Sequence, residues 1–170
     1  HSTPNYTDDS DYYFVNGNNL IKGRIKIQPN TKKVTEEEYI KHKKELSTST
    51  ILMSINGTIG NLAFYNMENV VLGKSAAYIN LNELAINKMF FYYYLQTRQI
   101  KLFYLKELTG TTIANLSLKS IRKTPTVIAA MEEQQKIAAI LSEADAKIEK
   151  EQTQKAHLEA LKKGLMQQLL

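Results

Sequence analysis

The last forty residues constrain the fold of this chain more than any other segment. Residues 131–170 contain no proline and one glycine, Gly164, and they are rich in the strong helix formers Ala, Glu, Lys, Gln and Leu. At 1.5 Å per residue such a helix extends roughly 60 Å, which exceeds the width of a domain of this size. We therefore predict a long helix whose apolar face needs a partner outside the first part of the chain.

A heptad pattern marks that apolar face. Two core positions recur, one held by Ile137, Ala144, Glu151, Leu158 and Leu165 and the other by Leu141, Ile148, Lys155, Lys162 and Leu169. The row is apolar toward both ends and polar in its middle. We predict antiparallel packing against a second helix, with Glu151 of one helix meeting Lys155 of the other. The expected pairing residues are Ile137, Leu141, Ala144, Ile148, Leu158, Leu165 and Leu169.

The preceding residues have the pattern of a globular domain made of short elements. Runs that favour strands occur at residues 12–15 and 24–27, and several more lie between residues 50 and 80. Thr35 before three glutamates is typical of a helix start, and the lysines up to Lys44 suit the C-terminal end of that helix. Asn56-Gly57 is typical of a type I′ turn, which predicts a tight hairpin in a curved sheet.

The apolar segment from residue 83 to 107 predicts one core helix, which Gly110 ends and Pro125 keeps from continuing. Its aromatic run from Phe90 to Tyr94 has helical spacing, so we interpret the run as core packing rather than a platform for stacking bases. The predicted fold class is α/β (α+β). A globular domain with a curved, mostly antiparallel sheet covers residues 1–128, and a long coiled-coil helix covers residues 129–170.

The charge distribution indicates what the globular domain can bind. The chain carries a net charge of +5, and residues 131–170 hold seven acidic residues against six lysines, so the basic excess belongs to residues 1–130. A basic domain favours a polyanion such as DNA as its partner. The chain has no cysteine, which fits a reducing compartment, and it has no apolar run of about 18 residues. We therefore expect a cytoplasmic protein without a membrane partner.

The sequence lacks the motifs of the common enzyme classes. It contains no P-loop, no Gly-x-Gly-x-x-Gly and no Asn-Pro-Pro-aromatic segment of the kind that holds a flipped base. The three histidines are scattered, and Asp145 and Lys147 point about 200° apart on a helix, so they form no nuclease site. Without cysteine, thiol catalysis and thiolate metal sites are excluded. We predict that this chain holds no catalytic residue, metal or cofactor.

Two segments have the composition needed for close approach to a ligand. Residues 54–61 (Ser-Ile-Asn-Gly-Thr-Ile-Gly-Asn) and 110–117 (Gly-Thr-Thr-Ile-Ala-Asn-Leu-Ser) are small, polar and interrupted by glycine. Asn can bind adenine bidentately and Ser or Thr can bind phosphates, although each segment is equally consistent with a simple tight turn. With the flanking basic residues, the candidate DNA contacts are Lys22, Arg24, Asn56, Thr58, Asn61, Lys74, Thr111, Thr112, Asn115, Arg122 and Lys123.

These segments together resemble the specificity subunit of type I restriction-modification systems. Residues 131–141 (Met-Glu-Glu-Gln-Gln-Lys-Ile-Ala-Ala-Ile-Leu) and 160–170 (Ala-Leu-Lys-Lys-Gly-Leu-Met-Gln-Gln-Leu-Leu) resemble the start and the end of that family's spacer helix. Residues 110–117 and 57–61 resemble two landmarks of its target-recognition domain. Ala129-Ala130 stand where the family usually has prolines.

The resemblance implies a non-catalytic DNA-recognition role and several partners. These are double-stranded DNA, methyltransferase (modification) subunits, the restriction subunit within the complex, and a second spacer helix. S-adenosylmethionine, ATP and Mg²⁺ are expected on the partner subunits and not on this chain. One recognition domain and one spacer helix correspond to half of a subunit, either the C-terminal half or a natural half-sized version that forms a homodimer.

Two other interpretations remain open at the level of the sequence. The chain is also consistent with a coiled-coil adaptor that does not read DNA, or with a fragment of a fused restriction enzyme or methyltransferase. Salt dependence separates the first alternative, because phosphate contacts make affinity fall steeply as salt rises.

Overall fold

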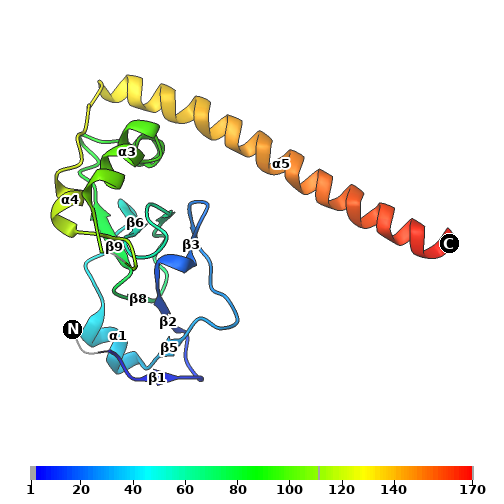
Figure 1. The fold of residues 1–170 in the computed structure, drawn as a ribbon, viewed down its shortest axis with the longest axis horizontal. Helices are drawn as coiled ribbons and strands as arrows, with labels where there is room; N and C mark the ends of the chain where they lie inside the picture. The colour runs from blue at the N-terminus through cyan, green and yellow to red at the C-terminus, as the bar shows by residue number, and fades with distance from the viewer. Residues whose placement is uncertain (1–2, 111, 170) are drawn as a thin grey trace.

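The computed structural model describes residues 3–110 and 112–169, and Figure 1 shows their arrangement. Residues 3–130 form a globular part. Helix α5 (Met131–Leu169) passes along one edge of this part and then projects away from it, so the C-terminal end lies far from the other elements (Figure 1). The predicted combination of a mixed α/β domain and a long C-terminal helix is confirmed.

The N-terminal strands form a four-stranded sheet with β8. Its strands, in spatial order, are β1 (Tyr6–Thr7), β5 (Lys33–Val34), β2 (Tyr12–Val15) and β8 (Val70–Leu72). Neighbouring strands are antiparallel except β2 and β8, which are parallel. Helix α1 (Glu36–His42) follows β5, and Thr35 caps it as predicted, because its side chain accepts a hydrogen bond from the Glu38 N–H at 3.3 Å.

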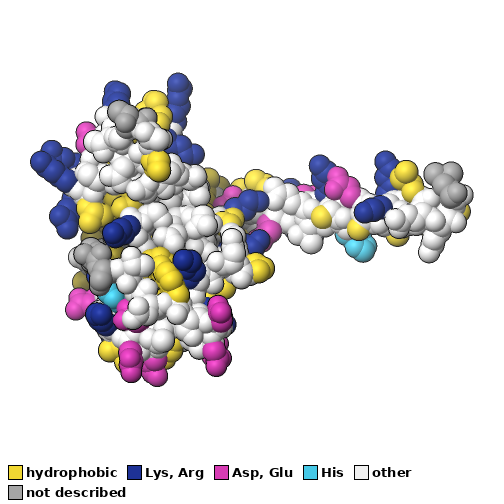
Figure 2. Space-filling model, turned by 60° about the horizontal axis from the view of Figure 1, so that its bottom comes forward, with side chains coloured by type: hydrophobic (Ala, Val, Ile, Leu, Met, Phe, Trp, Pro, Cys, Tyr) yellow, Lys and Arg dark blue, Asp and Glu magenta, His cyan; other side chains and the backbone are white. Residues whose placement is uncertain are grey.

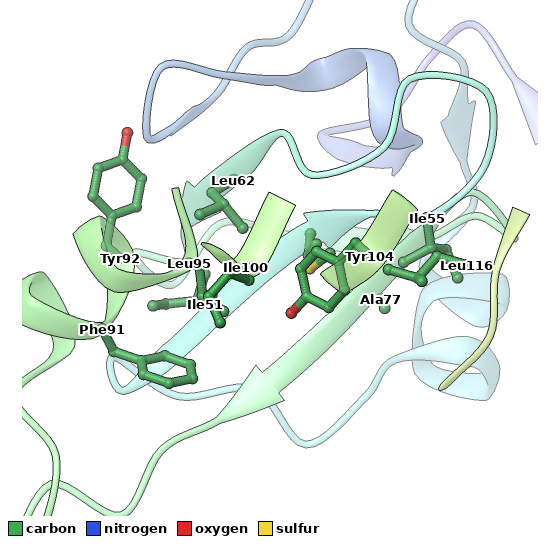
Figure 3. Close-up of a cluster of buried hydrophobic side chains, with 11 residues drawn as sticks. Ile51, Ile55, Leu62, Ala77, Phe91, Tyr92, Leu95, Ile100, Tyr104 and Leu116 are labelled. Carbon is green, nitrogen blue, oxygen red and sulfur yellow. The ribbon is translucent and has the colours of Figure 1, made fainter. Parts of the chain in front are cut away.

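A second sheet provides the centre of the domain. Strand β6 (Thr50–Ser54) pairs antiparallel with β7 (Leu62–Phe64) on one side and with β9 (Ala76–Asn80) on the other. All five β6 residues are buried, and successive side chains point to opposite faces of the strand. Ile51 and Met53 therefore enter one hydrophobic cluster with Leu95, Ile100 and Leu116 (Figure 3), whereas Leu52 enters another with Val15 and Leu20.

The segment predicted as one helix over residues 83–107 forms two helices instead. Helix α2 (Lys88–Leu95) ends at Gln96, and α3 (Arg98–Glu107) begins after Thr97, whose side chain accepts a hydrogen bond from the Ile100 N–H. Residues 96–99 are all polar and Thr97 is a preferred N-cap residue, so the sequence carried a local signal for this break between two apolar runs. The aromatic run of α2 packs in the core as predicted, because Phe90, Phe91 and Tyr92 are buried.

The prediction of a type I′ turn at Asn56-Gly57 is wrong. Residues 55–61 form a longer connection between β6 and β7, and Asn56 does not have the positive φ that such a turn requires. Positive φ values at two adjacent residues occur at Lys22 (+48°) and Gly23 (+79°), which connect β3 (Leu20–Ile21) to β4 (Arg24–Ile25). The tight hairpin is therefore β3–β4, which follows the short 3₁₀ helix η1 (Gly17–Asn19).

The remaining elements connect α3 to the long helix. A two-stranded ladder pairs β10 (Leu108–Thr109) with β11 (Asn115–Leu116), and the short helix α4 (Leu118–Arg122) follows. An extended segment then leads to α5. Gln134, in the first turns of α5, is fully buried, and its side-chain oxygen accepts a hydrogen bond from the Asn87 N–H at 2.9 Å. Its amide group donates to the Ala85 and Ala129 carbonyls at 3.0 and 2.9 Å, so one side chain fixes the start of α5 to the loop before α2.

Candidate nucleic-acid interface

The two glycine-interrupted segments lie side by side on the globular part. Residue 56 bridges residue 115 in antiparallel fashion, the Gly57 N–H donates to the Ala114 carbonyl at 3.0 Å, and the Leu116 N–H donates to the Ile55 carbonyl at 2.8 Å. We call residues 55–61 the first loop and residues 110–117, which include β11, the second loop. Main-chain hydrogen bonds thus join two segments that are more than fifty positions apart in the sequence.

Glycines give each loop its shape. Gly57 (φ +73°) and Gly60 (φ +85°) have left-handed backbone conformations, and a Cβ atom at either position would meet nothing within 4 Å. They are needed for their dihedral angles and not for lack of room. At Gly110 both constraints apply, because φ is +95° and an added Cβ would collide with the Ile113 carbonyl. The first loop is closed at its base, where the Asn61 N–H donates to Ser54 Oγ at 2.8 Å.

The loops present short polar side chains to solvent. Asn56, Thr58 and Thr112 are exposed, whereas Asn61 and Asn115 are half-buried. Thr111 lies outside the described residues. No hydrogen bond within the described part of the chain occupies the amide groups of Asn56 or Asn115. An amide that has no partner within the fold is free to bind a base edge or a phosphate.

Two of the predicted basic contacts lie beside the first loop. Lys74 and Arg122 line a hollow of about 630 Å³, together with Ile55 at the base of the loop and Leu118 on α4. Lys44 lines the same hollow and was not among the predicted contacts. Both Lys74 and Arg122 are exposed, so their charges can reach a polyanion lying over the loops. Lys123, the next residue after α4, is also exposed.

The other two predicted contacts have partners on α5. Arg24 Nη2 lies 3.3 Å from Glu149 Oε1, and Lys22 Nζ lies 3.4 Å from Gln152 Oε1. The β3–β4 hairpin is still next to the first loop, because Gly23 exchanges backbone hydrogen bonds with Leu62 and Phe64 of β7. The charged ends of Lys22 and Arg24, however, are directed to the long helix.

The basic excess is concentrated in one part of the domain. Residues 1–83 contain nine Lys and Arg against nine Asp and Glu, whereas residues 84–130 contain seven against the single acid Glu107. Helix α3 contributes three exposed cations that the sequence analysis missed: Arg98, Lys101 and Lys106. The alternation of basic residues with the apolar residues Ile100 and Tyr104, which are buried, is the signal that could have identified them. In Figure 2 Lys and Arg gather toward the upper and left edges of the globular part, and most Asp and Glu lie along its lower edge.

A second exposed surface follows α5. The predicted pairing residues are largely uncovered, with Leu141 at 38%, Ile148 at 53%, Leu158 at 55% and Leu169 at 79% exposure. Ala144 and Leu165 are exposed as well, and Ile137 is half-buried at the edge of the domain. Exposed apolar residues that the heptad register did not include are Ile140, Leu161 and Met166. Near the C-terminal end, Leu158, Leu161, Leu165 and Leu169 line a shallow groove on the helix (apolar side chains are yellow in Figure 2).

The side of α5 that faces the domain is polar. After the buried residues Gln134 and Ala138, the helix contacts the domain through Asp145, Glu149 and Gln152. Tyr93 donates a hydrogen bond to Asp145 Oδ2 at 2.9 Å, and it lies 3.4 Å from Ser142 Oγ. Burial raises the pKa of Tyr93, and the nearby Asp145 carboxylate raises it further, so the hydroxyl remains a donor at neutral pH. The domain therefore leaves the apolar row of α5 uncovered.

Within residues 3–110 and 112–169, no group of three or more His, Asp or Glu side chains lies close enough to hold a metal ion. No described helix is both long and apolar enough to cross a bilayer.

Comparison with known proteins gives one family and one fold. Residues 2–160 match the family described as the type I restriction modification DNA specificity domain. The fold is similar to that of the type I restriction-modification S subunit from M. genitalium, with a TM-score of 0.54 and 22% identity over 85% of this chain. It is also similar to the HsdS subunit from Thermoanaerobacter tengcongensis, with a TM-score of 0.62 and 13% identity over 86% of this chain.

A third similar structure is a chain from work on the complex assembly and conformational transition of the type I R-M system. Its TM-score is 0.64, with 18% identity over 94% of this chain. The matched regions cover 34%, 37% and 38% of the three solved chains, so this chain spans about a third of their length.

Proposed function

Because this chain belongs to the family of type I restriction-modification DNA specificity domains, we propose that it is a non-catalytic module that recognises one half of a bipartite DNA target. The observation that carries this proposal is the joining of the two loops by main-chain hydrogen bonds beside Lys74 and Arg122. Exposed amide and hydroxyl groups then supply base contacts, and the neighbouring cations supply phosphate contacts.

The exposed row of α5 supports an antiparallel pair with a specific register. Thr153 lies midway in sequence between Ile137 and Leu169, between Leu141 and Leu165, and between Ile148 and Leu158. A twofold axis at Thr153 therefore places each of these residues beside its apolar counterpart in a second copy. The same axis places Glu151 beside Lys155 and Ala144 beside Lys162. One register thus satisfies both the apolar ends and the charged centre, whether the second helix comes from another copy or from the other half of a full subunit.

In this arrangement the helices set the separation of the two half-sites. Beyond the half-buried Ile137, the residues of α5 that contact the domain directly follow pairing positions: Ala138 follows Ile137, Asp145 follows Ala144 and Gln152 follows Glu151. The domain therefore sits beside the pairing row and does not obstruct it. A twofold axis perpendicular to both helices keeps the two domains on the same side of the pair, where both can reach one DNA duplex.

The opposite flank of α5 is the expected docking site for modification subunits. Ile140 and Leu161 directly precede pairing positions, so they face away from the side on which the domain lies, and both are more than half exposed. We expect methylation and cleavage, and the S-adenosylmethionine, ATP and Mg²⁺ that they require, to reside on the partner subunits. The purified chain alone should neither methylate nor cleave DNA.

The proposal is tested by selecting target sequences from a randomised duplex library with the chain and its modification subunits. Lys74→Ala should weaken binding to all sequences and reduce the slope of log affinity against log salt by about one, because one phosphate contact is lost. Asn115→Ala should change the selected bases and leave the salt slope unchanged. Lys163→Ala, on the projecting end of α5, is the matched control for charge. If no sequence is enriched and the salt slope is flat, the chain is an adaptor that does not read DNA.

A further inference from the structure

We propose that Arg24 and Lys22 are positioning residues that brace the domain against α5 and thereby determine which half-site spacing is accepted. This inference rests on the proposed function, since spacing matters only if two domains act on one DNA molecule. It assigns to these two cations a role different from the phosphate contact expected from the sequence. The contacts to Glu149 and Gln152, together with that from Tyr93 to Asp145, form a row over two turns of α5, which we call the brace.

The hairpin that carries both cations is held firmly by the domain. The Gly23 N–H donates to the Leu62 carbonyl at 3.0 Å, and the Phe64 N–H donates to the Gly23 carbonyl at 2.9 Å. A Cβ atom at Gly23 would approach the Tyr92 hydroxyl to 3.3 Å, so the turn lies directly against α2. Lys22 and Arg24 therefore extend toward α5 from a fixed base.

The backbone at Lys22 is unfavourable for a lysine. Its φ of +48° is in the left-handed region, which Asn and Gly occupy far more readily at this position of a type I′ turn. The local sequence therefore does not explain a lysine here. A contact outside the hairpin does, because the Lys22 ammonium reaches Gln152 on the long helix.

The brace lies far from the start of α5, so it controls the direction of the helix relative to the domain. Gln134 fixes the start of the helix, and Gln152 lies about 27 Å further along at 1.5 Å per residue. Gln152 is also the residue next to Thr153, where the proposed twofold axis crosses. A change of about 10° in the helix direction therefore moves the domain by about 5 Å relative to the axis, which exceeds the 3.4 Å rise of one base pair. Each contact is exposed and therefore weak, so the brace selects a geometry more than it adds stability.

The distance between domain and helix end can be measured within one chain. The chain has no cysteine, so the exposed residues Asn30 and Gln168 can be replaced by Cys and spin-labelled, and excess unlabelled chain limits each pair to one labelled copy. Arg24→Ala and Glu149→Gln should both broaden the distance distribution, and the swap R24E with E149R should restore it. Lys26→Ala and Glu143→Gln, which remove the same charges at neighbouring exposed positions, should leave it unchanged.

The same variants are then tested on duplexes that carry two half-sites separated by spacers of varied length. Under the proposal, Arg24→Ala and Glu149→Gln both reduce the preference for the best spacer by about two- to fivefold, the range expected for one exposed contact, and neither changes binding to a single half-site. Unchanged distances in Arg24→Ala, or opposite effects of the two variants on single half-site binding, would assign Arg24 to a phosphate and overturn the brace. The distance measurement requires neither DNA nor pairing, so its outcome is separate from that of the proposed function.

Discussion

The globular part and the long helix differ in how they bury their apolar side chains. Residues 3–130 build a core from two clusters of buried apolar side chains divided by β6, although some large apolar side chains such as Met67 and Leu105 stay exposed, and among the described residues of α5 only Ala138 belongs to the buried apolar set. The helix instead leaves Leu141, Ile148 and Leu158 more than a third exposed. The difference teaches that the domain can stabilise itself, whereas the last turns of α5 need a surface from another molecule, since helices in proteins gain most of their stability from packing of an apolar face.

Breaking the pairing row should have the largest effect and should leave the domain intact. We expect Leu141→Glu combined with Leu165→Glu to abolish self-association, because the four leucines of a pair, which are 38% and 47% exposed before pairing, contribute about 3 to 5 kcal/mol of burial and the new carboxylates would have to be buried in their place. Sedimentation equilibrium measures the association, and near-UV circular dichroism reports the packing of the domain. Lys147→Glu, an exposed change outside the row, is the control. A double variant that still pairs would require a different interface.

Removing the attachment between the two regions should have the next largest effect. Gln134→Leu leaves the Asn87 N–H and the Ala85 and Ala129 carbonyls without their partner, which should cost about 2 to 4 kcal/mol. Denaturant unfolding gives the loss, and hydrogen exchange at Asn87 shows where it occurs. Gln135→Leu alters the exposed neighbour and should change stability by less than about 0.5 kcal/mol. Equal losses in the two variants would contradict the role of Gln134.

High pH should destabilise the globular part before it destabilises the long helix. Burial raises the pKa of Tyr104 and of Tyr92 above the ordinary value of 10.0, whereas residues 131–170 contain no tyrosine. The protonated hydroxyl is favoured in the folded state, so the stability it contributes is complete below pH 10 and is lost as pH rises above it. Near-UV circular dichroism, which follows the domain, should fall at lower pH than the helical signal. Simultaneous loss of both signals would contradict separate stabilities.

The charged centre of α5 should contribute the smallest effect. In a pair of identical chains, Glu151→Ala removes two proposed ion pairs with Lys155, one on each side of the axis, and exposed pairs contribute about 0.2 to 1 kcal/mol each. We expect the dissociation constant to rise by about two- to thirtyfold at low salt and to be nearly unchanged at high salt. Disulfide trapping in the double variant Ile148→Cys and Leu158→Cys tests the register at the same time, because the proposed axis places these two residues of opposite helices side by side. Efficient trapping of Ile148→Cys alone would shift the register.

The elements that the sequence predicted well are those determined by local chemistry. Helix α1 begins at the Thr35 cap, and the long helix follows from composition alone. The buried strand β6 follows from its run of apolar residues. In these cases the residues that determine the structure lie within a few positions of one another.

The features that the sequence did not reveal depend on contacts between distant residues. The break at Gln96 and Thr97 is the exception, because the Thr97 cap and the polar residues 96–99 determine it locally. The tight turn at Lys22-Gly23 includes a lysine in a conformation that its own propensity disfavours. The side chains of Arg24 and Lys22, which the sequence predicted to contact DNA, instead contact Glu149 and Gln152 of α5. Composition identified the two loops, but only the bridge between residues 56 and 115 placed them together.

The two loops are held together by their main chain, so the residues that could contact a ligand are not needed for the fold. The bonds from Gly57 to Ala114 and from Leu116 to Ile55 use only main-chain atoms, which every residue type carries. The side chains of Asn56, Thr58 and Thr112 are exposed to solvent and take no part in these main-chain hydrogen bonds. Replacements at these three positions should therefore cost little folding energy while altering what the surface can bind. A domain built in this way can change what it binds without changing its fold.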